Sequence, residues 1–375
     1  MRGLGYVLFV ALASAALFEG LTRLVPSVPA RVASLEPERI WEDRFLEMMR
    51  RDRQFIAGGF HSPHPTRGWI VSPNVRKTVD GFAYTTNERG HRSLNAYRRD
   101  PAKYTVLAIG DSFTFGMETN DTATWPYLLE ERDPRLQVIN LGVSGYGVDQ
   151  MYITLRETIA DYAPDAVVVA FIGDDLRRVL LSFRDYKKPR FVLRGDQLEL
   201  TNVPIGSPDD IIAELETRRR WADRSLAARF ARGAFRQLLG LTSPPDAEPL
   251  REGDLTLVTR LFDEMRGLAR EHRAEFLLTY LSYGEGIFDA SRSEEGEAFL
   301  RDYGMRQGVA TLDTRPFFTE QPRKDWVKGH FQLRENLVVR DAVATRLSQL
   351  LAGRRPTLAS EGAGEYELTL ARAAP

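Results

Sequence analysis

A serine stands just beyond a short apolar segment, in the stretch LAIGDSFTFG at residues 107–116. The apolar run stops at Gly110, so we expect Ser112 on a strand-to-helix turn, where a side chain projects over the edge of a sheet. Backbone N–H groups at such a turn point outward and can bind an anion. A serine hydroxyl placed there is a candidate nucleophile, provided that a base takes its proton. The serine could also serve only as a helix N-cap, and the Gly-x-Ser-x-Gly pattern of α/β-hydrolases is absent, since Thr114 stands two residues after Ser112.

The elements that would position this serine begin at Lys103, where apolar and amphipathic segments start to alternate. Five short apolar runs predict buried parallel strands, namely YTVLAIG, LQVINLG, DAVVVAFIG, AEFLLTYLS and GVATLDT. The predicted helices cover Thr124–Arg132, Val148–Tyr162, Leu255–His272, Glu294–Tyr303 and about Arg334–Leu351. Strand–helix alternation predicts an α/β fold in which helices cover both faces of a parallel sheet. Active sites in such sheets lie at the carboxyl ends of the strands.

Further segments surround this α/β part, which we assign to residues 103–354. Residues 26–102 form an N-terminal extension, in which a predicted helix near Arg39–Arg53 precedes turn-rich sequence that predicts a small β element. Residues from about 178 to 252 interrupt the strand–helix alternation and are too many for a simple loop, so we interpret them as an insertion. The tail, residues 355–375, is polar and rich in small residues, and we expect it to be mobile.

The first 25 residues differ from the rest of the chain. Arg2 precedes an uncharged run, Gly3–Phe18, which is short for a membrane span of about 20 residues. The run is typical of a signal peptide, and Ala13-Ser14-Ala15 is a candidate cleavage site. Glu19 and Arg23 lie four residues apart, so a longer helix could still span a membrane if they pair or snorkel. A signal peptide and an uncleaved anchor, which we favour, both place the rest of the chain outside the cytoplasm. The alternative is a buried N-terminal helix of a cytosolic protein.

Composition excludes several classes of function. The chain has 51 Lys and Arg against 52 Asp and Glu, a balance that argues against a dedicated nucleic-acid binder. It has no cysteine, which excludes disulfides, thiolate zinc sites and a lipidated N-terminal cysteine. We expect His61, His64 and His91 to be loop residues, since no acid or cysteine completes a metal site near them. The predicted chemistry needs neither a metal nor a cofactor.

Four segments in order resemble the sequence blocks of the SGNH, or GDSL, hydrolase family. Gly-Asp-Ser after the first strand resembles the nucleophile block, and INLGVSGYGVDQ resembles the second block, with Gly145 as the best match to its glycine. FIGDDLRR resembles the third block, which usually ends in Asn-Asp, with Asp174 in the asparagine position. GHFQLREN resembles the histidine block, with His330 in that position. The resemblance covers roughly residues 103–352 without the insertion, and it implies a flavodoxin-like three-layer sandwich.

The resemblance also implies what these residues do. Ser112 would attack an ester carbonyl, and His330 would take its proton and return it to the leaving alcohol. The N–H groups of Ser112 and Gly145 would bind the oxyanion, with Asp174 at the third position of the oxyanion hole. The implied activity is that of a serine esterase, or of an acyltransferase in which a sugar hydroxyl replaces water.

The third oxyanion position departs from the family pattern. The family has an asparagine donor where this chain has Asp174, and an ionised carboxylate there would repel the developing alkoxide. Burial could keep Asp174 protonated, or Arg177 or Arg178 could supply another donor. The remaining alternative is a site that is catalytically weak or inactive.

The acid of the triad departs from the pattern as well. The family often places it two or three residues before the histidine, where this chain has Lys328 and Val327. We predict that Asp325, five residues before His330, orients the imidazole, with Asp313 as the second candidate. The alternative is that Asp325 is a surface charge and that His330 works with a backbone carbonyl.

The insertion holds a predicted hairpin, RFVLRGDQLEL with its turn at Gly195-Asp196, and an arginine-rich amphipathic helix at residues 218–240. That helix could lie on an anionic membrane surface, line the active site and meet an acidic polysaccharide, or pack with a solvated basic face.

By analogy, an exported member of the family with an added β element suggests an O-acetyl ester of an extracytoplasmic carbohydrate, or a small ester, as the substrate. The contrasting hypothesis is a non-catalytic carbohydrate-binding or assembly protein that retains the fold. Asp174 and the displaced acid favour it, whereas Ser112 and His330 oppose it.

Overall fold

Five strands form one parallel sheet in the order β13-β12-β7-β5-β6. They are β5 (Tyr104–Gly110), β6 (Leu136–Asn140), β7 (Ala166–Phe171), β12 (Glu275–Tyr280) and β13 (Ala310–Asp313). The computed structural model describes residues 37–51, 59–218, 250–284, 295–319 and 329–356, with five isolated positions before residue 21. The strand order is that of a flavodoxin-like sheet, and the predicted α/β fold is confirmed.

Helices cover both faces of the sheet. One face carries α6 (Val148–Tyr162) and α11 (Glu252–Glu271), and the other carries α5 (Trp125–Arg132) and α14 (Leu333–Leu350). On the interior strand β5, Leu107 and Ile109 belong to the first core, whereas Val106 and Ala108 belong to the second. Because successive side chains of a strand point to opposite faces, a continuous apolar run fills both layers of the core. This is why the buried strands could be recognised in the sequence.

A third helix, α12 (Glu295–Gln307), also packs in the first core through Phe299, Leu300 and Tyr303. The remaining helices lie at the ends of the strands or outside the sheet. They are α3 (Pro37–Arg51), α4 (Ser112–Phe115), α7 (Gly173–Arg178), α8 (Pro208–Arg218) and α13 (Arg315–Thr319), with a 3₁₀ turn at Asp121–Ala123. Two of these helices, α4 and α7, directly follow the carboxyl ends of the adjacent strands β5 and β7. The sheet therefore brings the segments around Ser112 and Asp174 to one edge.

The N-terminal extension forms two small antiparallel hairpins. The first pairs β1 (His61–His64) with β2 (Gly68–Val71), and the second pairs β3 (Arg76–Val79) with β4 (Phe82–Thr85). The prediction that His61 and His64 are loop residues is wrong, because both lie in β1 and His61 is buried. The rings of Phe60 and Tyr84 stack on Phe115, with centroids 5.3 and 6.1 Å away, so the extension packs directly against the helix that carries Ser112.

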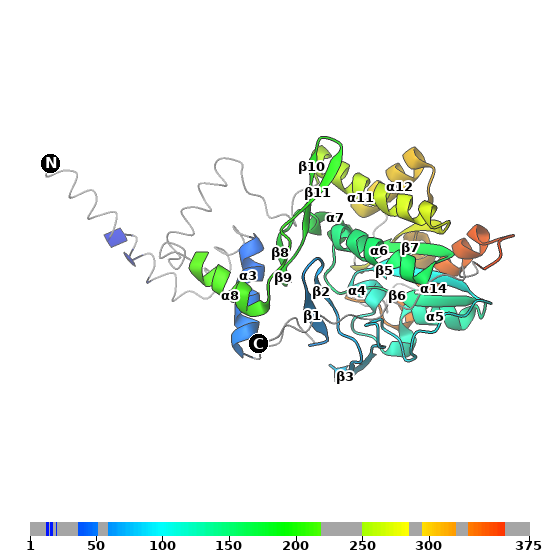
Figure 1. Cartoon of the computed structure of the whole chain (residues 1–375), viewed down its shortest axis with the longest axis horizontal. Helices are drawn as coiled ribbons and strands as arrows, with labels where there is room; N and C mark the ends of the chain where they lie inside the picture. Colours follow the sequence, from blue (N-terminus) through cyan, green and yellow to red (C-terminus); the bar gives the residue numbers. More distant parts are fainter. Residues whose placement is uncertain are drawn as a thin grey trace, which may run out of the picture.

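The insertion contains short strands, β8 (Phe183–Arg184) and β9 (Tyr186–Lys187), and a hairpin of β10 (Arg190–Arg194) and β11 (Gln197–Thr201). The hairpin turn falls at Gly195 and Asp196, as predicted. Of the predicted arginine-rich helix, only Arg218, at the end of α8, is among the described residues, and it forms an ion pair with Glu42 of α3. Figure 1 shows α3 and α8 side by side, away from the sheet.

Within the described part of the chain, no helix combines the length and the apolar character that a membrane span requires. The predicted signal peptide or anchor, residues 1–25, lies outside the described residues except at the five isolated positions. The tail beyond residue 356 also lies outside them.

Candidate active site

Ser112 is the first residue of α4, immediately after the turn that ends β5. The cap of this helix is Asp111, whose buried carboxylate accepts a hydrogen bond from the N–H of Phe113 at 2.9 Å. Because Asp111 performs the capping, the hydroxyl of Ser112 is not used as a cap. The turn also requires a glycine at position 110, since a Cβ there would overlap Thr114 and the carbonyl oxygen of Ala170. Strand, turn and cap together fix the serine at the sheet edge.

The imidazole of His330 meets Ser112 from the other end of the chain. Its Nε2 lies 2.9 Å from the Ser112 Oγ, and its Nδ1 lies 3.2 Å from Oε1 of Glu118. The ring packs on Phe113, with centroids 5.0 Å apart, and 29% of the side chain is exposed. In the tautomer with the proton on Nδ1, the Nε2 lone pair faces the serine hydroxyl. Such a pair can move a proton from the hydroxyl to the ring.

The loop after β6 runs beside the end of β5, since the N–H of Val143 donates to the carbonyl oxygen of Gly110 at 3.1 Å. Gly145 has φ +82°, a conformation that favours glycine, and a Cβ there would overlap the Arg184 guanidinium. The loop is anchored by the indole of Trp69, which donates to the carbonyl oxygen of Ser144 at 2.9 Å. Among the described residues, the N–H groups of Ser112 and Gly145 donate to no carbonyl oxygen, and the buried hydroxyl of Ser144 also has no partner there. These donors remain available to a bound group.

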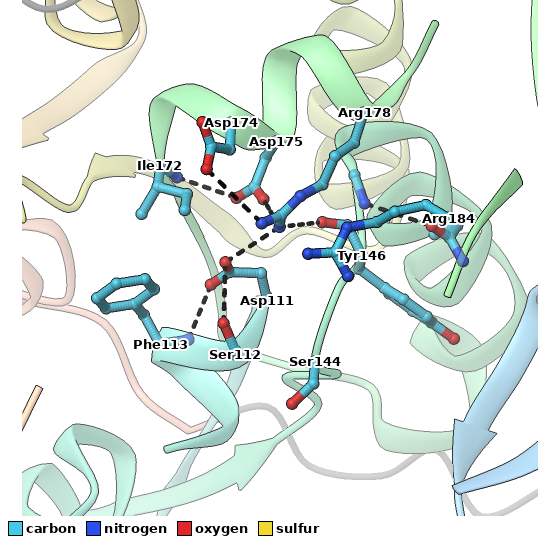
Figure 2. A network of polar contacts seen from close by, with 12 residues as sticks. Asp111, Ser112, Phe113, Ser144, Tyr146, Ile172, Asp174, Asp175, Arg178 and Arg184 are labelled. Carbon is cyan, nitrogen blue, oxygen red and sulfur yellow. Dashed lines mark hydrogen bonds and ion pairs between the residues drawn. The ribbon is translucent and has the colours of Figure 1, made fainter. Parts of the chain in front are cut away.

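A buried arginine connects the site to α7 (Figure 2). The guanidinium of Arg178 lies between the carboxylates of Asp111, at 3.3 Å, and Asp175, and it donates to the carbonyl oxygen of Tyr146 at 2.9 Å. Asp111 Oδ2 is also 3.4 Å from the Ser112 Oγ. Arg178 thus balances a buried negative charge next to the serine hydroxyl.

The charges in this network depend on one another. Burial raises the pKa of Asp175 well above its usual range, and the nearby Asp111 carboxylate adds to the effect, while Arg178 opposes it. Burial alone would lower the pKa of Arg178, but the Asp175 and Asp111 carboxylates outweigh it and raise that pKa above its ordinary value. Arg178 therefore stays charged, whereas the raised pKa of Asp175 favours the protonated form of that carboxyl.

A second buried ion pair supports the same region. Lys188 and Asp149 are both fully buried, and the Lys188 ammonium donates to the Asp149 carboxylate. It also donates to the carbonyl oxygens of Arg178, at 3.1 Å, and Leu181, at 3.3 Å. The insertion thereby fixes the end of α7 and the start of α6 relative to each other.

The sequence matches the model of the GDSL-like Lipase/Acylhydrolase family over residues 108–332, which is more than half of the chain. The chain belongs to this family. No curated protein sequence matches it.

Several solved structures are similar to this family member at low sequence identity. TesA is 15% identical over 66% of this chain and 99% of that chain, with a TM-score of 0.38. The acetyl xylan esterase AlAXEase is 13% identical over 64% and 98%, with a TM-score of 0.35. The psychrotrophic esterase EstA from Pseudoalteromonas sp. is 11% identical over 66% and 99%, with a TM-score of 0.34.

Asp174, in the position of the GDSL-family asparagine, lies on α7 and not on a loop. Its side chain is 50% exposed, accepts a hydrogen bond from the Tyr283 hydroxyl at 3.3 Å and lies 4.0 Å from Arg178. The structure therefore does not give Asp174 the burial that a neutral carboxyl donor would need. Of the two arginines considered as replacement donors, Arg178 points into the site, while Arg177 forms an ion pair with Glu295 at 2.8 Å.

Among the described residues of this GDSL-family chain, the carboxylate at His330 is not that of the second candidate, Asp313. Asp325 lies outside the described residues. Asp313, at the end of β13, accepts the N–H of Arg315 at 2.9 Å and makes no described contact with the histidine. The carboxylate at the ring is that of Glu118, which sequence reasoning missed. No motif marks it, because the contact joins segments that lie at opposite ends of the α/β part.

Proposed function

We propose that the protein is a serine esterase, or an acyltransferase of the same chemistry, with Ser112 as nucleophile and His330 as general base. The observation that supports this most directly is the distance of 2.9 Å between Ser112 Oγ and His330 Nε2. Nucleophilic catalysis by serine requires a base within hydrogen-bond reach, and 2.9 Å is within that reach. Membership of a lipase and acylhydrolase family makes an ester the expected substrate.

In this mechanism Ser112 Oγ forms a bond to the ester carbonyl carbon as its proton passes to His330 Nε2. The carbonyl oxygen becomes an alkoxide. When the tetrahedral intermediate collapses, the bond to the leaving alcohol breaks and the alcohol takes the proton from the imidazolium. Water, or a sugar hydroxyl, then gives its proton to His330 and bonds to the acyl carbon. The bond from that carbon to Ser112 Oγ breaks, and Oγ takes the proton back from the imidazolium. No metal or cofactor takes part in these steps.

The alkoxide would be stabilised by the N–H groups of Ser112 and Gly145, which have no carbonyl acceptor among the described residues. We do not assign a donor role to Asp174, because its carboxylate is half exposed. Arg178 contributes instead by balancing the charge of Asp111, which lies 3.4 Å from the nucleophile. An unbalanced carboxylate at that distance would oppose the alkoxide.

For the substrate and location, we propose an O-acetyl ester of an extracytoplasmic carbohydrate, or a small ester. The location depends on the uncharged segment Gly3–Phe18 behind Arg2, which is typical of an export signal or anchor. A C-terminal alkaline phosphatase fusion, which is active only outside the cytoplasm, should be active, and an inactive fusion would contradict export. Membrane fractions that keep the protein in high salt would indicate a retained anchor, whereas a soluble, shortened protein would indicate cleavage.

The activity is tested with p-nitrophenyl acetate. The purified protein should hydrolyse it, and Ser112→Ala and His330→Ala should each remove most of the activity. Because the two residues act as a unit, the double variant should be little slower than either single variant. Activity that survives Ser112→Ala would place the chemistry elsewhere. Absence of activity in every form would favour a carbohydrate-binding or assembly protein that retains the fold.

A further inference from the structure

The carboxylate of Glu118 lies against the segment that carries His330, with one oxygen near the imidazole ring and the other near the backbone. Its Oε1 lies 3.2 Å from His330 Nδ1, and its Oε2 would lie 3.5 Å from a Cβ on the neighbouring Gly329. We propose that Glu118 is the acid that orients His330, a role that depends on the proposed esterase function. Glu118 touches the histidine but not the reacting atoms, so it is a positioning residue.

The chemistry of this contact follows from the two ring nitrogens. A carboxylate at Nδ1 accepts a hydrogen bond from Nδ1–H and so favours the tautomer with the proton on Nδ1, which leaves the Nε2 lone pair directed at Ser112. When the serine proton arrives on Nε2, the same carboxylate stabilises the imidazolium. Glu118 thus performs both tasks of a triad acid, although it belongs to the nucleophile segment and does not precede the histidine in the chain.

The backbone at Glu118 is held in an unfavourable conformation by contacts on both sides. Its φ is +56°, which is uncommon for a residue with a side chain. Its N–H donates to the Tyr84 hydroxyl at 2.9 Å, and its carbonyl oxygen accepts from the side-chain amide of Gln332. Strained backbone persists only where the surroundings determine it, and such positions cluster at functional sites. Here the surroundings aim the side chain at His330.

The N-terminal extension supplies this support. Buried Arg92 donates to the carbonyl oxygens of Phe115, at 3.1 Å, and Thr119, at 2.6 Å, and its Nε donates to Asp121 at 3.0 Å. The same guanidinium lies 4.3 Å from the centroid of the Tyr84 ring. Arg92 therefore ties both ends of the loop that carries Glu118 to the extension. The added β element has a catalytic consequence, because it sets the position of the acid.

The test compares Glu118→Gln with a matched control. Glu199 is suitable for the control, because its side chain is 49% exposed, against 50% for the side chain of Glu118. Glu199 also forms an ion pair, with Arg194 at 2.7 Å, and it lies on the distant hairpin. Glu118→Gln should lower kcat for p-nitrophenyl acetate on the order of 10²-fold, less than the ~10⁴-fold seen for a buried triad acid, with little change in KM. Glu199→Gln should leave kcat unchanged. Asp325→Asn should be milder than Glu118→Gln.

A purely structural role is separated by combining variants. In the His330→Ala background, Glu118→Gln should cause no further loss, because a residue that acts through the imidazole has nothing left to position. An additive loss would overturn the proposal, as would wild-type kcat in Glu118→Gln, or a larger loss in Asp325→Asn. If Ser112→Ala and His330→Ala stay active, the esterase mechanism itself fails, which is a different outcome.

A spectroscopic measurement tests the contact without turnover. The protonated imidazole of His330 should give a far-downfield Nδ1 proton resonance in NMR spectra at low pH, because Nδ1–H donates a hydrogen bond to a carboxylate. The resonance should be absent in His330→Ala and lost or shifted upfield in Glu118→Gln. A resonance unchanged in Glu118→Gln would overturn the proposal even in an inactive protein.

Discussion

The buried charge of Arg178 can be removed with little change in side-chain length by Arg178→Met. The substitution takes away the cation that lies 3.3 Å from Asp111 and also pairs with Asp175. It leaves two fully buried carboxylates without their partner. We predict a large loss of stability, in contrast to the neighbouring Arg177→Met. Arg177 pairs with Glu295 where both side chains are more than 20% exposed.

The magnitude follows from the burial. Removing one member of a buried ion pair costs about 3–5 kcal/mol, because the other charge stays buried and uncompensated. The raised pKa of Asp175 lets it take up a proton, so we expect the lower end, about 3 kcal/mol near pH 7.5. Arg177→Met should cost less than about 1 kcal/mol, the range for partly exposed pairs.

The pH dependence has a definite sign. Loss of Arg178 raises the pKa of folded Asp175 further, so the folded variant binds a proton at pH values where the unfolded carboxyl has lost it. Acidification therefore favours the folded state, and the destabilisation should shrink by up to about 1.4 kcal/mol per pH unit.

Urea unfolding at pH 7.5 and 5.5 measures both effects. Asp175→Asn in the Arg178→Met background should recover part of the stability, because it removes one of the uncompensated charges. The reasoning is refuted if Arg178→Met costs no more than Arg177→Met, or if its cost is the same at both pH values.

Two further predictions concern Asp174 and His91. Asp174→Asn replaces a half-exposed carboxylate by a neutral amide, so the rate of ester hydrolysis should stay similar or rise. A strong loss of hydrolysis would show that the carboxylate is needed. A fall only in transfer to the native acceptor would indicate that Asp174 contacts that acceptor. Burial lowers the pKa of His91 to about 4 from 6.5, so the stability it contributes is complete above pH 6.5 and is lost as the pH falls toward 4. Between pH 7 and 5 this loss of stability is about 2 kcal/mol. The urea unfolding midpoint of the wild-type protein should therefore fall with pH, and His91→Gln should remove the part of this fall that His91 causes. An equal fall in His91→Gln would contradict the assignment of this pH dependence to His91.

The parts of the fold that could be predicted are those with a local sequence signal. The five strands lie in short, mainly apolar runs, and the helix Val148–Tyr162 begins and ends at the predicted residues. The turn at Gly195 and Asp196 is marked by the residue types themselves. By contrast, β1 has the sequence HSPH, which has no strand-like apolar alternation, so pairing with β2 decides its structure and His61 becomes buried.

The candidate site also has residues that could be predicted from the sequence and one that could not. Ser112, Gly145 and His330 could be named because their segments resemble sequence blocks of the GDSL family, each after a predicted strand or before the last helix. Glu118 could not, since its position depends on a positive φ and on contacts with Tyr84 and Gln332. These partners lie far apart in the sequence, and only the packed structure brings them together.

The measurement that tests the central claim most directly is covalent labelling by a fluorophosphonate, mapped by mass spectrometry. A serine activated by a base forms a stable phosphonyl adduct, so the wild-type protein should carry one adduct, on the peptide that contains Ser112. Ser112→Ala should carry none, and His330→Ala should label at least about 10²-fold more slowly. An unlabelled wild-type protein, or an adduct at another residue, would contradict the assignment of Ser112 and His330 as the catalytic pair.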